Sequence, residues 1–348
     1  MATQLSGMTP EELMKLAEDK SHKPFRGRQL FEQIHMKLAP SLDAVVQLPA
    51  DLRTQLTDQG CGVCSLQVAA TSTSTDGTVK LALETSGGQR IETVLIPMES
   101  GQYTQCISSQ AGCPLGCRFC VTGTLGFTGN LSAAEIVDQH LVALRLHPEI
   151  KVKNLVFMGM GEPLLNFDEV ARAVSLLQHP RGRNVSPRRI TISTAGVIPG
   201  IRRMGEELDA LLAVSLNAPD QQLRESLMPV ARQYPLDQLM EELRRFPLHP
   251  RRRITLEYVM LRDINDSVDQ ARQLVRLISH IRCKVNLIPY NPSSVTGLIG
   301  TDKQGIERFA ATLAQKNVTV TVRASKGQDI EAACGQLAGQ KPTLEAPD

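Results

Sequence analysis

Past residue 100, the chain alternates between short β-rich runs and amphipathic helical segments, and this alternation constrains the fold more than any other feature. Runs that are apolar at nearly every position are typical of strands buried on both faces. They cover residues 155–158, 189–193, 211–216, 254–259, 285–288 and 318–322. Helical segments at 132–144, 167–177, 236–246, 267–281 and 305–315 separate them. Right-handed crossovers would join six such βα units into a partial parallel (βα)6 barrel, an α/β fold with its chemistry at the carboxyl ends of the strands.

The first hundred residues do not follow this pattern. Thr9, followed by Pro10 and two glutamates, predicts the start of a helix in a small helical accessory domain. Turn-rich β segments then predict a β-rich extension that leads into the barrel. The expected organisation is a helical domain at 1–60, the β-rich extension at 61–98, the barrel with its C-terminal segment at 99–340 and a tail at 341–348.

Composition excludes several classes of protein. Thirty-eight Lys and Arg against 36 Asp and Glu give a net charge of +2, far from the excess of a purely electrostatic nucleic-acid binder. Aromatic residues make up 3% of the chain, so we do not expect a base-stacking RNA-recognition sheet. The sequence has neither an apolar run of about 18 residues nor a signal-like amino terminus, which predicts a cytoplasmic protein without membrane contact.

A basic corner near the amino terminus is the best candidate for contact with a folded RNA. It comprises Lys20, Lys23, Arg26 and Arg28. The same residues also fit a solvated helix entry, so they indicate RNA contact only if the substrate is RNA. Because phosphate contacts dominate affinity for nucleic acids, we expect the accessory domain to position such a substrate.

Half of the eight cysteines lie between residues 106 and 120. In a cytoplasmic chain they stay reduced, so clustered thiols indicate metal or redox groups rather than structural disulfides. Cys113, Cys117 and Cys120 follow a C-x3-C-x2-C spacing on a loop that contains glycine and proline. Three thiolates on one loop can hold three corners of an iron–sulfur cubane and leave the fourth iron open. A structural zinc site with Cys106 as fourth ligand is the main alternative.

This spacing, with Phe119 before the last cysteine, resembles the cluster loop of radical S-adenosylmethionine (SAM) enzymes. The resemblance implies one [4Fe–4S] cluster on Cys113, Cys117 and Cys120, with SAM bound at the open iron. Residues 159–163 resemble the glycine-rich motif that contacts the SAM amino group, and a carboxylate there suits an ammonium ion.

A narrower resemblance covers most of the chain, from about residue 24 to residue 339. It rests on segments 106–113, 158–166, 193–196 and 329–337, which together resemble the RlmN and Cfr family of RNA adenosine methyltransferases, and RlmN most. The resemblance implies SAM contacts from Gly161, Glu162, Ser193, Ser215, Leu216, Asn217 and Asn291. Asn217 departs from the family pattern, where His is more usual, but an amide can still hydrogen-bond a ribose or carboxylate.

The family resemblance also implies a route for the methyl group. Cys334 takes a methyl from one SAM, because a thiolate is a competent nucleophile. A second SAM, cleaved reductively at the cluster, activates this S-methyl group for addition to adenine, so two SAM are used per turnover. Cys106 then attacks the sulfur of Cys334 and leaves a transient disulfide that external thiols reduce. Glu92, in an E-T-V-x-I-P context, is the implied proton acceptor; otherwise it is an outward-facing strand carboxylate.

Three functions remain open at this point. The first is methylation of adenine C2 in the peptidyl-transferase region of 23S rRNA and at the adenosine 3′ of the tRNA anticodon. The second is Cfr-type methylation at C8, which gives antibiotic resistance, and the third is a non-enzymatic, zinc-stabilised RNA-binding protein. We favour the first, in a monomer that uses an unidentified one-electron donor and a thiol reductant. Cys61, Cys64 and Cys283 are expected to be ordinary packing residues.

Overall fold

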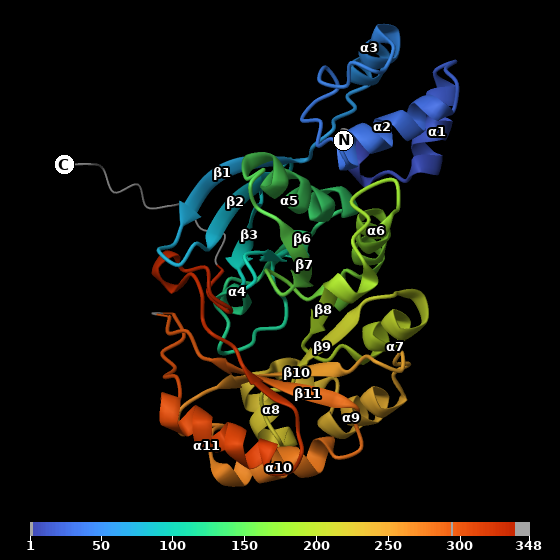
Figure 1. Cartoon of the computed structure of the whole chain (residues 1–348). Helices are drawn as coiled ribbons and strands as arrows, with labels where there is room; N and C mark the ends of the chain where they lie inside the picture. The colour runs from blue at the N-terminus through green and yellow to red at the C-terminus, as the bar shows by residue number, and fades with distance from the viewer. Residues whose placement is uncertain (1–2, 294, 338–348) are drawn as a thin grey trace, which may run out of the picture.

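A ten-stranded sheet runs through the computed structural model, which describes residues 3–293 and 295–337 (Figure 1). In the order of the sheet, the strands are β1 (Leu66–Thr73), β2 (Val79–Thr85), β3 (Arg90–Pro97), β4 (Tyr103–Cys106), β7 (Val152–Phe157), β8 (Ile190–Thr194), β9 (Leu211–Ser215), β10 (Ile254–Met260), β11 (Cys283–Pro289) and β12 (Val320–Val322). Strands β1 to β4 pair antiparallel, whereas the pairs from β4 through β12 are all parallel. The sheet is open, with β1 and β12 at its ends, so the predicted partial parallel barrel is confirmed. The predicted tail, 341–348, lies outside the described residues.

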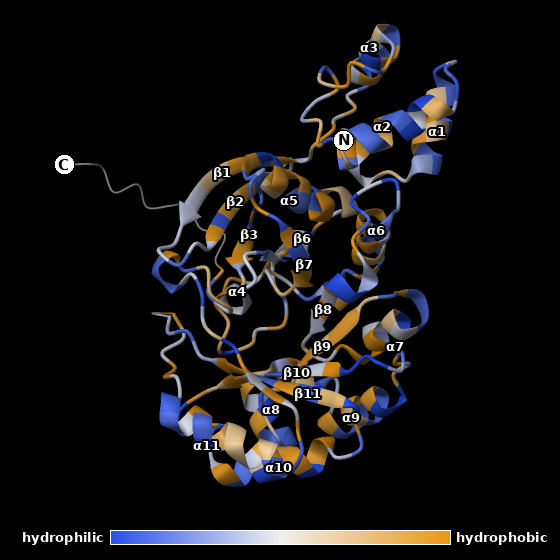
Figure 2. Ribbon diagram, in the orientation of Figure 1, coloured by the Kyte–Doolittle hydropathy of each residue, from blue (hydrophilic) through white to orange (hydrophobic). Residues whose placement is uncertain are grey.

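Helices connect the parallel strands and mix hydrophobic with hydrophilic residues, as helices with one buried face do (Figure 2). They are α5 (Ala133–Leu146), α6 (Phe167–Gln178), α7 (Ile198–Glu207), α8 (Gln221–Leu227), α9 (Leu236–Arg245), α10 (Val268–Ile278) and α11 (Lys303–Ala314). Capping boxes at Ser132 and Ser267 fix the starts of α5 and α10. The five predicted helices are confirmed to within a few residues, while α7 and α8 were not predicted. No helix in the described part of the chain is long and apolar enough to cross a membrane.

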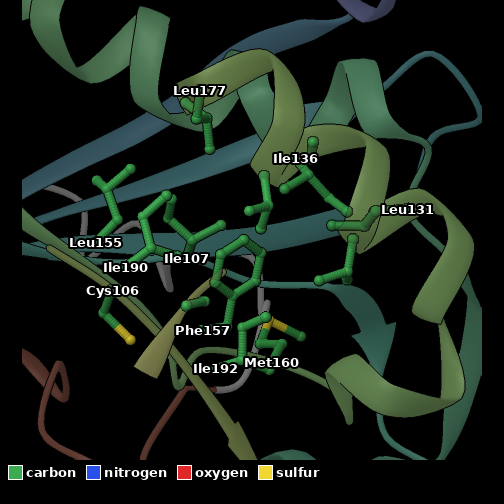
Figure 3. Close-up of a cluster of buried hydrophobic side chains, with 14 of the residues drawn as sticks. Cys106, Ile107, Leu131, Ile136, Leu155, Phe157, Met160, Leu177, Ile190 and Ile192 are labelled. Atoms are coloured by element: carbon green, nitrogen blue, oxygen red, sulfur yellow. The ribbon is translucent and has the colours of Figure 1, made fainter. Parts of the chain in front are cut away.

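The core of the barrel is packed between the first parallel strands and the helices that follow them. Figure 3 shows Phe157 of β7 and Ile192 of β8 beside Ile136 of α5, with Leu177 of α6 above them. All four side chains are at most 1% exposed. Each such burial contributes about 1.5–3 kcal/mol, so this packing holds the parallel strands against the helices that follow them.

Three short helices form a separate lobe beside the barrel (Figure 1). They are α1 (Pro10–Asp19), α2 (Phe25–His35) and α3 (Ala50–Asp58). The predicted helix start is confirmed, because the Thr9 hydroxyl accepts from the Glu12 backbone N–H at 3.2 Å and the Glu12 carboxylate accepts from the Thr9 N–H at 2.8 Å. The lobe is tied to the barrel by Arg172 of α6, which donates to the Gly7 carbonyl and pairs with Glu12.

The basic corner divides into structural and exposed members. Arg26 donates to the Gln29 side chain at 2.8 Å and to the Gln47 carbonyl at 3.0 Å, so it braces the loop before α3. Lys23 and Arg28 are exposed. These two, rather than Arg26, remain available for a phosphate.

Helices α1 and α2 cross at Gly27, where a side chain has no room. A Cβ at this position would lie 2.3 Å from the backbone carbonyl of Leu13. Gly27→Ala is therefore expected to push the helices apart and lower the free energy of unfolding by about 1–3 kcal/mol, measured by thermal unfolding. Gly87→Ala is the control, because its Cβ would meet only the Thr85 hydroxyl at 3.7 Å. Equal midpoints of thermal unfolding for the two variants would show that the close approach of α1 and α2 at Gly27 does not matter for stability.

Candidate active site

A pocket opens at the carboxyl ends of the parallel strands, where the fold predicts the chemistry. It measures about 930 Å³ including its open mouth. Nine of the predicted site residues line it: Cys113, Cys117, Cys120, Gly161, Glu162, Ser193, Ser215, Asn291 and Cys334. The fold thus brings the cysteine loop, the glycine-rich turn and a C-terminal thiol to one cavity.

A small hairpin holds the loop that carries the three cysteines. Strands β5 (Gln110–Gly112) and β6 (Phe127–Asn130) pair antiparallel, and α4 (Val121–Thr124) follows the loop. Gly112 has a φ of +73°, and a Cβ there would lie 2.0 Å from the Gly126 carbonyl oxygen, so only glycine fits. The same carbonyl accepts from the backbone N–H of Cys113 at 2.8 Å. The loop is therefore braced at its first cysteine.

The three thiols of this loop form a donor set that suits an iron–sulfur cluster. Burial raises the pKa of each thiol, to about 12 for Cys113, and the neighbouring sulfurs raise the pKa of Cys113 and Cys117 further. Three thiolates here repel one another until a cationic group joins them. Within the described residues, no three His, Cys, Asp or Glu side chains are arranged around a single metal ion. A cubane takes its thiolates at separate corners, and Cys113, Cys117 and Cys120, which all line the pocket, can supply three of them.

A buried arginine lies beside the cluster loop. Arg224 of α8 is 0% exposed, and its Nη2 donates to the carbonyls of Ala195 and Ser215. Its Nε and Nη1 have no partner in the described part of the chain. Burial lowers its pKa to about 10, and the Cys117 sulfur opposes that shift. This cation can offset the negative charge of the thiolates, which also fits a cluster at this position.

Glu162 presents a buried carboxylate to the same pocket. Its Oε2 accepts from the Ala195 N–H at 2.7 Å and its Oε1 from the Leu164 N–H at 3.1 Å. Burial raises its pKa to about 7, although these hydrogen bonds oppose the shift. The preceding Gly161 has a φ of +97°, and a Cβ there would lie 2.5 Å from the Gln110 side chain. A carboxylate so desolvated gains from a cationic ligand group.

Glu92 and Cys106 lie on one face of the antiparallel strands at the edge of the barrel. Cys106 pairs with Val94, and Glu92 precedes Val94 by two residues, so both side chains point to the same side. Glu92 is 4% exposed and therefore is not an outward-facing strand carboxylate. Burial raises the pKa of Cys106 to about 12, with Cys334 adding to the rise.

Cys334 lies between the cluster loop and Cys106. Its carbonyl accepts from Asn291 Nδ2 at 3.2 Å, and the carbonyl of Gly335 accepts from the Val121 N–H at 2.8 Å. Cys334 lines the main pocket with the three loop cysteines, and it lines a smaller hollow with Cys106 and Cys120. One thiol therefore borders both the cluster loop and the second predicted thiol.

All eight cysteines are free thiols, so the structure does not support a Cys106–Cys334 disulfide in this state. That bond is expected only as a transient product of turnover, and both cysteines are reduced in this structure. Cys61, Cys64 and Cys283 are half-buried against the core and do not line the pocket.

Comparison with known proteins identifies the family. Residues 107–275 match the radical SAM superfamily. A crystal structure of a radical SAM methyltransferase from Sphaerobacter thermophilus is similar with a TM-score of 0.94 and 39% identity, over 97% of this chain and 100% of that one. The dual-specificity RNA methyltransferase RlmN of Geobacter sulfurreducens is 43% identical over 341 residues, 98% of this chain and 93% of the relative. Its namesake from Nitratidesulfovibrio vulgaris is 47% identical over 324 residues, 90% and 88% of the two chains. This chain belongs to the RlmN family.

Membership of the RlmN family confirms the resemblance found in the sequence and the enzyme class, a radical SAM RNA methyltransferase. It overturns the alternative of a non-enzymatic, zinc-stabilised RNA-binding protein. The family implies a [4Fe–4S] cluster and SAM, which agrees with the three thiols of the loop and the carboxylate at the pocket wall.

Leu216 and Asn217, two of the predicted SAM contacts, are buried, and their side chains are not among those that line the pocket. Their contact with SAM stays a prediction. Asn217 has a φ of +59°, its Nδ2 donates to the Met228 sulfur, and its Oδ1 accepts from the Val259 N–H at 2.8 Å. Asn tolerates a left-handed backbone better than most residues. The hydrogen bond from Val259 to the Asn217 side chain links the segment after β9 to β10.

Sequence reasoning missed two charged residues in the pocket wall. Glu257 of β10 is 5% exposed and accepts from Asn286 Nδ2 at 2.7 Å. Arg323, directly after β12, has its pKa raised by the nearby Cys334 sulfur, by Glu257 and by Cys106. A glutamate inside the apolar run of β10 was the available signal for the first, because a charge in a doubly buried strand needs a partner. Nothing local marks Arg323.

Proposed function

We propose that this enzyme methylates C2 of an adenosine in the peptidyl-transferase region of 23S rRNA and C2 of the adenosine 3′ of the tRNA anticodon. The observation that carries the proposal is Cys334, which borders both the three cluster-loop thiols and Cys106. That arrangement suits a methyl group that travels through a protein sulfur. The curated relatives are dual-specificity RNA methyltransferases, which supports two RNA substrates.

The target carbon explains why thiols are needed. Adenine C2 is an electron-poor sp² carbon between two nitrogens, so it cannot attack the methyl of SAM directly. The Cys334 thiolate can, and it forms a new S–CH3 bond while the C–S bond of the sulfonium breaks and its electron pair stays on S-adenosylhomocysteine. The methyl group is then held at the pocket, next to the site of its activation.

Each further residue has a separate task in this proposal. Cys113, Cys117 and Cys120 hold the cluster, and Gly161, Glu162, Ser193, Ser215 and Asn291 line the volume in which SAM binds. When bound, the cluster would supply the electron for reductive cleavage of a second SAM, so that two SAM would be used per turnover. Once the radical adduct has given up one electron, which the cluster would take back, Glu92 takes up the proton of the adenine carbon. The Cys106 thiolate then attacks the Cys334 sulfur, and the S–S bond forms as the C–S bond to the adduct breaks. The electron pair of the broken bond stays on the methylene carbon, which takes a proton and becomes the product methyl group.

The raised pKa of Glu162 predicts that SAM affinity depends on pH. A carboxylate binds the ammonium group of SAM, whereas the neutral acid does not. Because Glu162 takes up a proton near pH 7, SAM binding is expected to weaken about tenfold as the pH falls from about 8 to about 6, measured by calorimetry. The Glu162→Gln variant should bind SAM more weakly, and its affinity should not change with pH over this range. A flat profile for the unchanged protein would contradict the ammonium contact.

We also propose a role for each segment of the chain and for its partners. Residues 1–60 position the folded RNA, residues 61–98 extend the barrel sheet, and the barrel with the C-terminal segment carries out the chemistry. Lys23 and Arg28 are exposed on the first of these segments, where they can meet phosphates. The enzyme works as a monomer in the cytoplasm, where its RNA substrates are, with a one-electron donor and a thiol reductant.

Mass spectrometry of nucleosides tests the position of methylation. RNA lacking the modification is incubated anaerobically with the cluster-loaded enzyme, SAM and a reductant, and then digested. 2-Methyladenosine is the expected product. 8-Methyladenosine would favour the Cfr-type activity instead, and unmodified adenosine, with SAM cleaved, would contradict both.

A further inference from the structure

The turn between β1 and β2 holds the segment that carries Cys334. We call residues 323–337 the Cys334 arm; in Figure 1 it passes beside this turn. The Ser74 hydroxyl and the Thr75 N–H donate to the Asp329 carboxylate at 2.6 and 3.1 Å, and the Gly327 N–H donates to Asp76 at 2.9 Å. The β-rich extension is thus part of the active site, because it anchors the nucleophile.

One side chain of the extension reaches both the arm and Glu92. Lys80 of β2 places its Nζ 3.6 Å from Glu92 Oε1 and donates to the Glu331 carbonyl at 3.4 Å. The side chains of Lys80 and Glu92 are 15% and 5% exposed, so little water screens their ion pair. A single ammonium therefore joins the proposed proton acceptor to the arm that carries the proposed nucleophile.

The backbone of the arm at this point needs such a partner. Glu331 has a φ of +51°, a left-handed conformation that is unfavourable for a non-glycine residue. The Glu331 backbone N–H donates to the Gln328 carbonyl at 3.2 Å, and the Lys80 ammonium donates to the Glu331 carbonyl. The contact with Lys80 thus stabilises a strained residue three positions before Cys334.

We propose that Lys80 is a positioning residue, which holds the Glu92 carboxylate and the Cys334 arm in a fixed arrangement relative to each other. This inference rests on the proposed function for the roles of Glu92 and Cys334. Proton removal from adenine occurs while the base is joined to the Cys334 sulfur, so the carboxylate and the arm must be correctly placed at the same moment. The ammonium of Lys80 contacts the Glu92 carboxylate and the backbone of the arm, and it acts on the reaction through these two groups rather than on the adenine itself.

Amide hydrogen exchange tests the contact with the arm in cluster-free protein. Lys80→Met is expected to speed exchange at the amides of Glu331 and Ala332, while Lys80→Arg keeps them protected, because its guanidinium can still donate to both acceptors. Lys303→Met, which removes an exposed lysine of α11, is the matched control. Unchanged exchange in Lys80→Met would overturn the proposal.

The contact with Glu92 is tested in the loaded enzyme. In Lys80→Met, methylated RNA should form on the order of 10–100-fold more slowly, while Cys334 still takes its methyl and the covalent adduct of RNA with Cys334 accumulates. Lys80→Arg should recover most of the rate. Product formation at the unchanged rate, or loss of Cys334 methylation in proportion to product, would overturn the proposal. If the unchanged enzyme methylates no RNA, the proposed function fails, and the exchange result still decides the arm contact.

Discussion

Cys334→Ala is expected to abolish methylation of RNA, with a loss of more than about a thousandfold in rate. The methyl group then has no sulfur to travel through, and adenine C2 cannot take it from SAM directly. The cluster loop is unaffected, because Cys334 contacts it from a separate segment of chain. Cluster absorption and reductive cleavage of SAM should therefore persist while labelled methyl fails to reach RNA.

Cys283→Ala is the matched control for this variant. Cys283 is also a half-buried free thiol, at the start of β11, and it does not line the pocket. The Cys283→Ala enzyme should methylate RNA at the same rate as the unchanged enzyme. Substantial methylation by Cys334→Ala would show that the methyl group reaches RNA without this sulfur.

Cys106→Ala is expected to trap RNA covalently on Cys334. Cys106 and Cys334 share a hollow with Cys120, and Cys120 belongs to the cluster loop, which leaves Cys106 as the thiol that can attack the Cys334 sulfur. Without it the carbon–sulfur bond of the adduct cannot break. A band of protein joined to RNA should survive denaturation and thiol reagents, and peptide mass spectrometry should locate it at Cys334.

Cys64→Ala serves as the comparison, since Cys64 donates to the Leu66 carbonyl far from the pocket and should leave no adduct. If Cys106→Ala releases only free RNA, with the cluster in place and SAM cleaved, then another group resolves the adduct.

Much of the fold followed from periodicity, because a parallel barrel buries its strands on both faces and its helices on one. The failures were local. Helix α7 carries Pro199 and Gly200 in its first turn, which masks the helical pattern. Helix α8 has seven residues, too few to show a periodic face. The hairpin β5–β6 was not predicted, because Gly112 and Gly126, which approach each other closely in it, indicate a loop in the sequence.

The residues of the site also fall into those that the sequence predicts and those that only the folded chain reveals. The cluster cysteines and Glu162 could be predicted because each motif is contiguous in sequence, and the structure brings these residues to one pocket. Asn217 sits in a matching motif, and the structure adds what the motif does not reveal, that its amide hydrogen-bonds the Met228 sulfur and the Val259 backbone N–H. Lys80 and Arg323 act on residues far along the chain, so only the folded sheet shows what they contact.

Isotope tracing of the methyl group tests the central claim, that the methyl passes through the sulfur of Cys334, most directly. The enzyme is run for several turnovers with SAM whose methyl group is fully deuterated, and the methyladenosine is analysed by mass spectrometry. Activation of the S-methyl group removes one deuterium, so the account predicts a product methyl with two deuteriums and the third in 5′-deoxyadenosine. A product that keeps all three deuteriums would show direct transfer from SAM and contradict the account.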